Sequence, residues 1–480
     1  MVQFKCCECI VASCDQTVHI MRDMPMTFSA TPSESLPRNR VSKRTQAVYS
    51  VVQNVPGSGL PHLSDETPLV GLIDLDLVDV LFKDLEAAFV SPGTTLHAVA
   101  CKAAPVRGLL QRYADMGAGC EVASKGELEL ALASGFSPDK IVFDSPAKTW
   151  SELRQGLELG VSMNIDNFDE LSRVDEILSD REHLLTRKDM PVIGLRINPQ
   201  TGSGEIEALS TASKTSKFGI GLSDLGTRAE VVQAYLDRPW MTQIHVHSGS
   251  QGVSLQHAAH GISQVVALAQ EVNDLSARRG GSDKQIKRID IGGGLAVNFA
   301  GDEVTPTFAD YRKVLEDAVP ELFDFDLVTE FGRALLAKTG TIVTRVEYVK
   351  SAGDRKIAVT HAGVQVATRT AYAPKDWPLR ILPFDAAGLP KEQGELVAHD
   401  IAGPACFAGD LLAQDTMLPL LQPGDIVAVP ETGAYYFSNH FSYNLLPRIP
   451  IHGYYGDRDQ QFVLLRRGQT TEEILAEASI

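Results

Sequence analysis

Short apolar runs alternate with longer amphipathic stretches between residues 94 and 335. Apolar runs of about four to eight residues are typical of buried strands, whereas longer amphipathic stretches are typical of helices. The strand-like runs are Leu96–Lys102, Cys120–Ser124, Lys140–Ser145, Ser162–Asp166, Val192–Asn198, Gln243–Ser248, Arg288–Ile291 and Leu327–Glu330. These eight units predict an α/β fold, a (β/α)8 TIM barrel, because a doubly wound open sheet rarely needs so many and no strand–GxGxxG–helix unit opens the chain.

The pattern changes after residue 335. Strand-like runs such as Thr341–Lys350 and Lys356–His361 are separated by Gly, Pro and Asp turns, with few helical stretches between them. This pattern predicts a mostly antiparallel C-terminal domain, a β-sandwich or β-barrel, over residues 336–480. Another strand-like run, Leu69–Leu75, precedes the barrel, and we expect the segment 46–93 to contribute it to the β domain.

Residues 1–45 show no sustained period and end in a basic stretch, which predicts a poorly ordered tail. This segment holds four of the seven cysteines, and their spacing fits no usual zinc pair. It also lacks the charged region, apolar core and cleavage site that are typical of a signal peptide. We therefore expect a cytoplasmic protein.

Composition and charge exclude several classes of protein. The 480 residues include 61 acidic and 44 basic side chains, which gives a net charge of −17. Such a chain repels phosphate backbones, so we expect no general binding of nucleic acid. No uncharged apolar run reaches about 18 residues, so we expect no membrane span.

Active sites of (β/α)8 barrels lie at the carboxyl ends of the strands, so the residues that close each run are candidates for chemistry. Lys102 closes the first run, where burial lowers the pKa of its ammonium group, and a neutral lysine amine can form a Schiff base. The sixth run contains His245 and His247, which point to the same side of the sheet. This pair is open to three interpretations: a metal-binding pair, a ring stacked on a flat cofactor, or hydrogen-bonded core histidines.

The last two runs end in groups that suit a phosphate and a ring nitrogen. The glycines Gly292–Gly294 follow the seventh run, and a glycine loop lets backbone amides approach an anion closely. Glu330 closes the eighth run, and Arg333 follows it, where a guanidinium can join the amides in a phosphate clamp. Together with Lys102 and Ser250, these groups predict a site for pyridoxal phosphate, which needs an amine, a phosphate clamp and a carboxylate at its ring nitrogen.

Nine blocks of sequence occur in the order that is typical of one family. They are HAVACKAAP, CEVASKGELELAL, KIVFDSPAKT, KFGIG, HVHSGSQ, DIGGG, EFGR, GPACFAGD and GAYYFSNHFSYN, within a region from about Leu69 to about Tyr455. By these blocks the chain resembles the group IV ornithine, diaminopimelate and arginine decarboxylases, and above all proteins like diaminopimelate decarboxylase. The resemblance implies the alanine-racemase-like fold, known as PLP fold type III, and a lyase of amino-acid metabolism whose cofactor is pyridoxal 5′-phosphate.

The resemblance also implies roles for single residues. Lys102 would hold the aldehyde of the cofactor as a Schiff base, His247 would stack on its ring, and Glu330 would pair with its ring nitrogen. Cys406 would reprotonate the product carbon. The other cofactor contacts would be Glu121, Ser250, Gly292, Gly293, Gly294, Arg333 and Tyr435. No metal is expected. In this family the cysteine block reaches the neighbouring subunit, which implies a homodimer with shared active sites.

Departures from the family pattern bear on the substrate. Phe407 stands where diaminopimelate decarboxylases usually carry a glutamate that binds the distal ammonium of the substrate. A phenylalanine cannot pair with a buried ammonium, and an unpaired buried charge is costly. The usual motif that binds the substrate carboxylate is not matched here, although Arg369 and Tyr372 lie near its place in the sequence. Asp410 could take over part of the binding of the distal ammonium. We therefore expect an amino-acid decarboxylase whose substrate is not meso-diaminopimelate.

Three other functions remain open from the sequence. A metal-dependent barrel hydrolase could use His245 and His247, but it would need further ligands at other strand ends. A catalytically silent, decarboxylase-like protein could bind a regulatory partner, although Lys102, Glu330 and Cys406 are all present. A racemase that uses pyridoxal phosphate is a third alternative, and the cysteine block favours decarboxylation over it.

Overall fold

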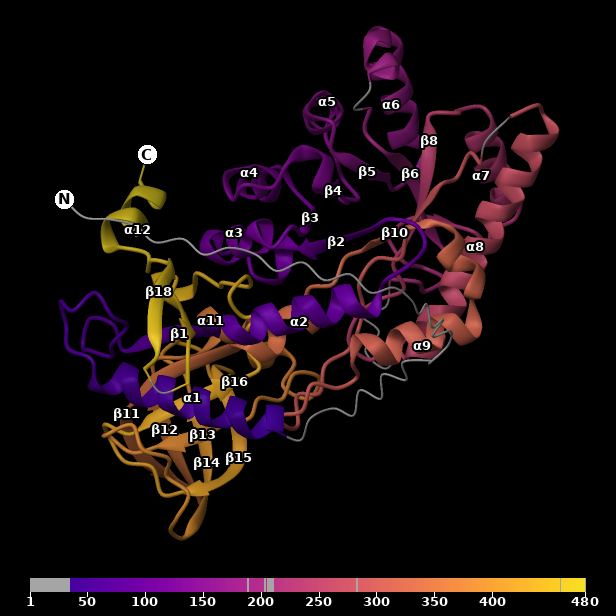
Figure 1. Cartoon of the computed structure of the whole chain (residues 1–480). Helices are drawn as coiled ribbons and strands as arrows, with labels where there is room; N and C mark the ends of the chain where they lie inside the picture. Colours follow the sequence, from indigo (N-terminus) through magenta and orange to yellow (C-terminus); the bar gives the residue numbers. More distant parts are fainter. Residues whose placement is uncertain are drawn as a thin grey trace, which may run out of the picture.

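The structure, a computed structural model, describes residues 35–187, 190–202, 204, 211–281, 284–457 and 459–479. Its elements form a parallel barrel and a mixed β domain, which Figure 1 shows at opposite ends of the molecule. Most of the expected tail, residues 1–34, lies outside the described residues. Residues 35–45 belong to helix α1 (Ser35–Gln53), so the expected tail boundary at residue 45 was wrong.

Eight parallel strands close the barrel, which confirms the predicted fold. They are β2 (Thr95–Ala100), β3 (Gly119–Val122), β4 (Ile141–Phe143), β5 (Ser162–Ile165), β6 (Ile193–Asn198), β8 (Met241–Val246), β9 (Arg288–Asp290) and β10 (Asp326–Thr329). Their order is β5-β4-β3-β2-β10-β9-β8-β6, and β6 pairs back with β5 to complete the ring. A short strand, β7 (Ile220–Gly221), pairs with β6. The strands read as continuous apolar runs because parallel strands are buried on both faces.

Helices cover the outside of the barrel. They are α3 (Arg107–Asp115), α4 (Lys125–Ala133), α5 (Trp150–Leu159), α6 (Phe168–Asp180), α7 (Thr227–Leu236), α8 (Leu255–Arg278) and α9 (Phe308–Ala318). Side-chain caps define where several of them begin: Thr149 and Thr307 form capping boxes, and Asn167 caps α6. These caps lie in loops that follow the strands, so they hold the rim at which the chemistry is expected.

The β domain is one branched, mixed sheet. Its strands are β1 (Leu69–Asp74), β11 (Gly340–Ala352), β12 (Arg355–Thr360), β13 (Leu382–Phe384), β14 (Leu396–Ala402), β15 (Leu411–Pro419), β16 (Ile426–Pro430), β17 (Ile451–Tyr455) and β18 (Gln461–Arg466). The main path is β15-β14-β12-β11-β1-β17-β18, while β16 pairs with β11 and β13. Strand β1 is antiparallel to β11 and parallel to β17. A strand that precedes the barrel in sequence therefore lies inside the sheet that follows it.

Helix α1 packs on this β domain. Its residues Ala47, Val48 and Val51 are fully buried, in one cluster with Val70 and Leu72 of β1. Helix α1 is ordered by this packing rather than by its own pattern, as is common for protein helices. The remaining α-helices are α2 (Leu75–Ala88), α10 (Arg333–Leu336), α11 (Val364–Tyr372) and α12 (Thr471–Glu477). Among the described residues, no helix has the length and apolar character that crossing a membrane requires.

Candidate active site

The candidate residues of the barrel meet at the carboxyl ends of its strands. Lys102 lies in a short 3-10 helix, η1 (Cys101–Ala103), directly after β2 and not at the end of the strand as expected. His247 follows β8, Gly292 follows β9 and Glu330 follows β10. A cavity of about 270 Å³ opens here. The predicted site residues that line it are Lys102, His247, Ser250, Gly294, Glu330, Arg333 and, from the β domain, Tyr435.

Lys102 is paired with Glu121, which ends up beside it on the neighbouring strand β3. The Nζ atom of Lys102 donates to both carboxylate oxygens of Glu121 at 2.6 Å. Burial alone would lower the pKa of Lys102, but the carboxylates of Glu121 and Glu330 outweigh burial and raise that pKa. The expected lowering of the lysine pKa was therefore wrong, because it left out the acids of neighbouring strands. Burial also raises the pKa of Glu121 to about 7.

Glu330 is buried and has one oxygen without a donor. Its Oε2 atom lies 3.5 Å from His245 Nε2. Its Oε1 atom has no hydrogen-bond partner among the described residues. Burial and the nearby carboxylates of Asp144 and Glu121 raise the pKa of Glu330 well above its ordinary value. A buried acceptor in this position calls for a ligand that brings a donor.

The glycine loop is packed tightly on His247. The backbone N–H of Gly293 donates to His247 Nδ1 at 3.0 Å, so this nitrogen carries no proton. Burial lowers the pKa of His247 well below its ordinary value, which keeps the ring neutral. At Gly292, where φ is 65°, a Cβ atom would lie 2.5 Å from His247 Nδ1. At Gly294, a Cβ atom would lie 2.3 Å from the carbonyl oxygen of Gly249. Both positions therefore require glycine.

Two guanidinium groups share the same pair of aromatic rings beside the cavity. The Arg333 guanidinium lies 4.8 Å from the rings of both Trp377 and Tyr435. That of Arg369 lies 5.1 Å and 4.9 Å from the same two rings. Arg333 Nε also donates to Ser250 Oγ at 3.2 Å. Burial lowers the pKa of Arg333 to about 10. No carboxylate among the described residues pairs with either arginine, so this corner attracts an anion.

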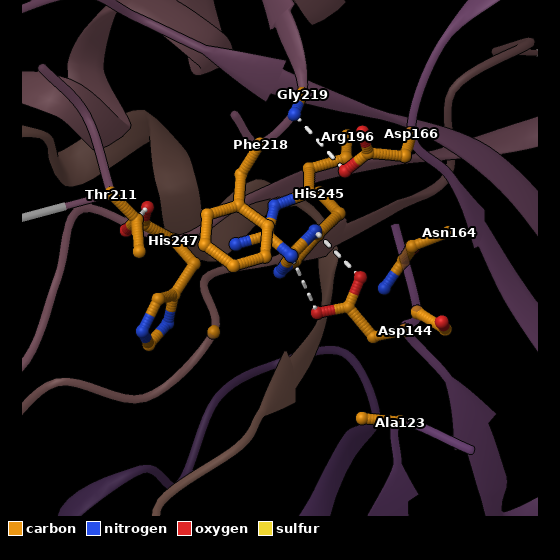
Figure 2. A network of polar contacts seen from close by, with 12 residues as sticks. Ala123, Asp144, Asn164, Asp166, Arg196, Thr211, Phe218, Gly219, His245 and His247 are labelled. Atoms are coloured by element: carbon orange, nitrogen blue, oxygen red, sulfur yellow. Dashed lines mark hydrogen bonds and ion pairs between the residues drawn. The ribbon is translucent and has the colours of Figure 1, made fainter. Parts of the chain in front are cut away.

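The sequence analysis missed Trp377, because a lone tryptophan between predicted elements gives no signal of its contacts. It also missed Asp144 and Arg196, which line the cavity. Asp144 closes the third strand-like run, Lys140–Ser145, and its position there was a usable signal. Arg196 lies within the fifth run and reaches Asp144 across the barrel: its Nη1 atom donates to Asp144 Oδ2 at 3.1 Å (Figure 2).

The two histidines of the sixth run point to different partners. His245 Nδ1 lies 3.7 Å from Asp144 Oδ1. His245, Asp144 and Glu330 lie close enough together to hold one ion, and His247 does not belong to that group of described residues. Figure 2 shows the His247 ring turned away from Asp144. The interpretation of the two histidines as a metal-binding pair was therefore wrong.

The other candidates lie in the β domain and do not line the cavity. Cys406 is exposed, and its backbone N–H donates to Asn444 Oδ1 at 2.7 Å. The carboxylate of Asp410 is buried and accepts from the backbone N–H groups of Ala405 at 2.6 Å and Val364 at 2.5 Å. Asp410 thus fixes the loop that carries Cys406, and the structure does not bring it to Lys102.

An aromatic cluster includes Phe407, the residue that follows Cys406. Phe407 is stacked on Tyr372, with ring centroids 5.6 Å apart and an angle of 12°. It also meets the edge of Tyr443 at 6.1 Å. Phe441 completes the cluster by stacking on Tyr443 at 5.8 Å and by contacting Tyr372 at 5.9 Å. This aromatic cluster, Tyr372, Phe407, Phe441 and Tyr443, places aromatic rings next to the cysteine in sequence and no carboxylate.

Comparisons with known proteins agree with this site. The family described as pyridoxal-dependent decarboxylase, pyridoxal binding domain, matches residues 78–337. The chain is 33% identical to the diaminopimelate decarboxylase of Pseudomonas fluorescens, over 79% of this chain and 86% of that protein. It is 32% identical to the diaminopimelate decarboxylase of Vibrio cholerae, over 73% of this chain and 79% of that protein.

Solved structures give the same fold. Diaminopimelate decarboxylase from Helicobacter pylori, complexed with L-lysine, matches with a TM-score of 0.73 and 26% identity, over 85% of this chain and 96% of that one. The lysine/ornithine decarboxylase from Vibrio vulnificus, complexed with putrescine, shares the fold with a TM-score of 0.64 and 20% identity, over 80% of this chain and 94% of that one. These likenesses confirm fold type III. They give no support to a hydrolase, a racemase or a silent binding protein.

Proposed function

The chain belongs to the pyridoxal-dependent decarboxylases, and on this basis we propose that its cavity removes CO₂ from an amino acid other than meso-diaminopimelate. The protein is a carboxy-lyase whose cofactor is pyridoxal 5′-phosphate. The observation that carries the proposal is the place of Lys102, whose amine opens into a cavity shared with Glu330, Arg333 and His247.

The residues of the cavity fit the cofactor. Glu330 Oε1 is a buried acceptor without a donor, and a protonated ring nitrogen supplies one. Arg333 and Ser250 lie together at the same cavity as Gly294, where guanidinium, hydroxyl and backbone donors suit a phosphate. The cofactor, when bound, supplies the electron sink that stabilises the carbanion left by loss of CO₂.

The side chains of this chain divide the remaining work. Lys102 is the amine that would hold the aldehyde, and Glu121 keeps that amine at the cavity through its two contacts of 2.6 Å. His247 is neutral and held by Gly293, so it would offer a flat face to the ring. Glu330 would keep the ring nitrogen protonated, which stabilises the developing charge. Cys406 would deliver the proton to the product carbon.

The active unit is a homodimer in this proposal. Cys406 does not line the cavity that contains Lys102, and it is exposed. A general acid must come within hydrogen-bond reach of the atom that it protonates. A second subunit that places its cysteine at the mouth of the cavity would meet this requirement, and a two-fold arrangement would complete both sites in the same way.

The aromatic cluster supports a substrate without a distal ammonium next to Cys406. Phe407 and its three aromatic neighbours offer no carboxylate at this position. A buried ammonium without a counter-charge costs several kcal/mol. Arg333 and Arg369 instead favour an anionic group on the substrate or cofactor. An amino acid with a second carboxylate or an apolar distal group fits this distribution.

The test of the proposed function is release of CO₂ by the protein loaded with pyridoxal phosphate. The panel consists of meso-diaminopimelate, ornithine, lysine, arginine and carboxylate-bearing amino-acid conjugates, with Lys102→Ala as the blank. We expect release from a member other than meso-diaminopimelate and none from Lys102→Ala. Release from meso-diaminopimelate alone would overturn the substrate assignment, and a native protein that retains no cofactor would overturn the whole proposal.

Phe407→Glu tests the role of the aromatic cluster in selecting the substrate. The new carboxylate would provide the missing counter-charge for a distal ammonium, so we expect decarboxylation of meso-diaminopimelate to rise by about tenfold or more, as a charge-assisted contact is worth roughly 1.5–3 kcal/mol. Phe441→Glu is the matched control, because it adds the same charge to the same cluster without adjoining Cys406. Equal effects of both variants on kcat/KM would contradict the assignment.

A further inference from the structure

His245 lies wholly inside the barrel between two carboxylates. It is 0% exposed. Its Nε2 atom lies 3.5 Å from Glu330 Oε2, and its Nδ1 atom lies 3.7 Å from Asp144 Oδ1. Neither ring nitrogen has a hydrogen-bond partner among the described residues. The two carboxylates are thus the groups that face the two nitrogens, one on each side.

Asp144 is anchored on its far side. Arg196 Nη1 donates to Asp144 Oδ2 at 3.1 Å, and the guanidinium lies 4.4 Å from the ring of Phe218. The groups therefore stand in a row: guanidinium, carboxylate, imidazole, carboxylate. The row ends at Glu330, which lines the cavity and whose Oε1 atom has no hydrogen-bond partner among the described residues. Figure 2 shows the first part of the row, with dashed lines that join Asp144 to Arg196 and to His245.

Glu330 needs a partner on its inner side. The carboxylates of Asp144 and Glu121 are buried near it and repel its charge, because like charges interact strongly in a medium of low dielectric. A buried imidazole that donates no hydrogen bond is itself costly. Both costs fall when His245 donates toward Glu330 Oε2, because the donor holds this oxygen and leaves Oε1 directed at the cavity.

We propose that His245 is a positioning residue for Glu330: it holds the inner carboxylate oxygen, and the outer oxygen thereby holds the proton of the cofactor's ring nitrogen. The inference rests on the role given to Glu330 in the proposed function. His245 touches neither substrate nor cofactor and acts only through Glu330. The contribution of His245 to cofactor binding must therefore disappear when the ring nitrogen or the Glu330 carboxylate is removed.

The experiment compares binding of pyridoxal phosphate with binding of its 1-deaza analogue, in which C–H replaces the ring nitrogen. Each compound is titrated into the full-length apoprotein, and Kd is measured from the visible absorption of the bound compound. We expect the native protein to bind pyridoxal phosphate about tenfold or more tightly than the 1-deaza analogue, because groups in direct contact couple strongly. Glu330→Gln should lose most of this preference, and His245→Leu should lose as much. The double variant should lose no more than either single one.

Two further variants separate positioning from a merely structural role. His245→Gln has a side-chain N–H that can still donate to Glu330, so it should keep part of the preference and shift the absorption spectrum less than His245→Leu. His97→Leu is the matched control, because His97 is a half-buried histidine of strand β2 whose ring contacts the Thr329 hydroxyl. It should change the melting temperature without changing the preference.

Each outcome decides the inference. If His245→Leu retains the native preference, or if the losses from His245→Leu and Glu330→Gln add, His245 does not act through Glu330 and only this inference falls. If Glu330→Gln itself retains the native preference, the role of Glu330 in the proposed function falls with it. Should His245→Leu fail to fold, His245→Gln and its combination with Glu330→Gln give the same comparison.

Discussion

At the scale of single residues, the two arginines that share Trp377 and Tyr435 are the least expected feature. Two like charges are held together on two rings, and no described carboxylate balances them. Cation–π contacts with partly desolvated rings stabilise a guanidinium by roughly 0.5–2 kcal/mol. The rings hold the arginines in place, and an incoming anion supplies the missing charge.

Arg333→Ala should weaken binding of pyridoxal phosphate by about 1.5 kcal/mol or more, which is the lower end for hydrogen bonds to charged groups. The reason is that Arg333 also orders Ser250, so its loss removes two donors from one place. Equilibrium titration of the apoprotein measures the effect. Arg312→Ala, which breaks an ion pair with Glu316 on α9, is the control and should bind the cofactor normally. Normal binding by Arg333→Ala would remove it from the phosphate site.

His97 gives the molecule a predictable response to acid. Burial lowers the pKa of His97 to about 4, against an ordinary value of 6.5. The folded state therefore binds fewer protons than the unfolded state between these two values, and stability falls as pH drops from about 6.5 to 4. The full effect is on the order of 3 kcal/mol. Denaturant unfolding at several pH values should show a shallower loss in His97→Gln, with the exposed His260→Gln unchanged.

Several site residues could be predicted from the sequence because they stand directly after an apolar run. Lys102, His247 and Glu330 are examples, and the closed barrel brings them to one cavity. The ionisation of Lys102 could not be predicted, because it depends on Glu121 from another strand. Trp377 could not be predicted either, because its contact with Arg333 arises only when the β domain meets the barrel.

At the scale of elements, helix α1 connects the β domain to the barrel through charges. Arg40 Nη2 donates to Glu431 Oε1 at 3.0 Å, and Arg44 Nη2 donates to Asp302 Oδ1 at 2.9 Å. Arg380 contacts both carboxylates, at 2.7 Å to Asp302 and 2.9 Å to Glu431. Asp302 belongs to the loop between β9 and α9, and Glu431 directly follows β16. The same arginines thus bind one carboxylate of the barrel and one carboxylate of the β domain.

Glu431→Gln should destabilise the fold by about 3–5 kcal/mol, because it removes the buried anion and leaves Asp302 alone to balance three arginines. The Glu431 side chain is 2% exposed. The free energy of unfolding, from denaturant titration, measures the loss. Glu347→Gln is the control, since Glu347 pairs with Arg345 on the surface and such pairs contribute about 1 kcal/mol or less. Similar losses of unfolding free energy in both variants would show that the buried network stabilises the fold no more than the surface pair does.

The barrel strands could be predicted because each is a continuous apolar run of the right length. Strands β13, β15 and β17 could not, because they are short, partly exposed or parallel to a strand far away in sequence. Helix α1 was missed for a related reason: two of its arginines, Arg40 and Arg44, are buried in ion pairs rather than solvated. From sequence alone, a charged stretch predicts a solvated tail, because the carboxylates that pair with it lie far away along the chain.

At the scale of the whole molecule, the chemistry proposed here is divided between two places. Lys102 lies in the cavity of the barrel, and Cys406 lies in an exposed loop of the β domain that does not line it. A dimer with shared sites therefore predicts complementation. Mixing unfolded Lys102→Ala and Cys406→Ala subunits and refolding them should restore about a quarter of native activity, since half of randomly formed dimers are mixed and each has one intact site.

Each variant refolded alone provides the baseline for this measurement, and decarboxylation of the substrate found in the panel provides the readout. If the mixture is no more active than the two baselines, Cys406 and Lys102 act within one subunit or Cys406 has no part in the reaction. Sedimentation of the native protein gives an independent check, because the proposal requires a dimer at assay concentration.

The position of β1 in the sheet has a consequence for how the chain folds during its synthesis. This strand is synthesised before the barrel, whereas β11 and β17, the strands that flank it, are synthesised after. On the ribosome, all eight barrel strands emerge while β1 still has no sheet to join, and domains generally fold in the order of their synthesis. A protein fragment of residues 336–480 would lack the strand that joins the two halves of its sheet. Strands β11 and β17 would then expose unpaired backbone groups at two sheet edges, which promotes aggregation.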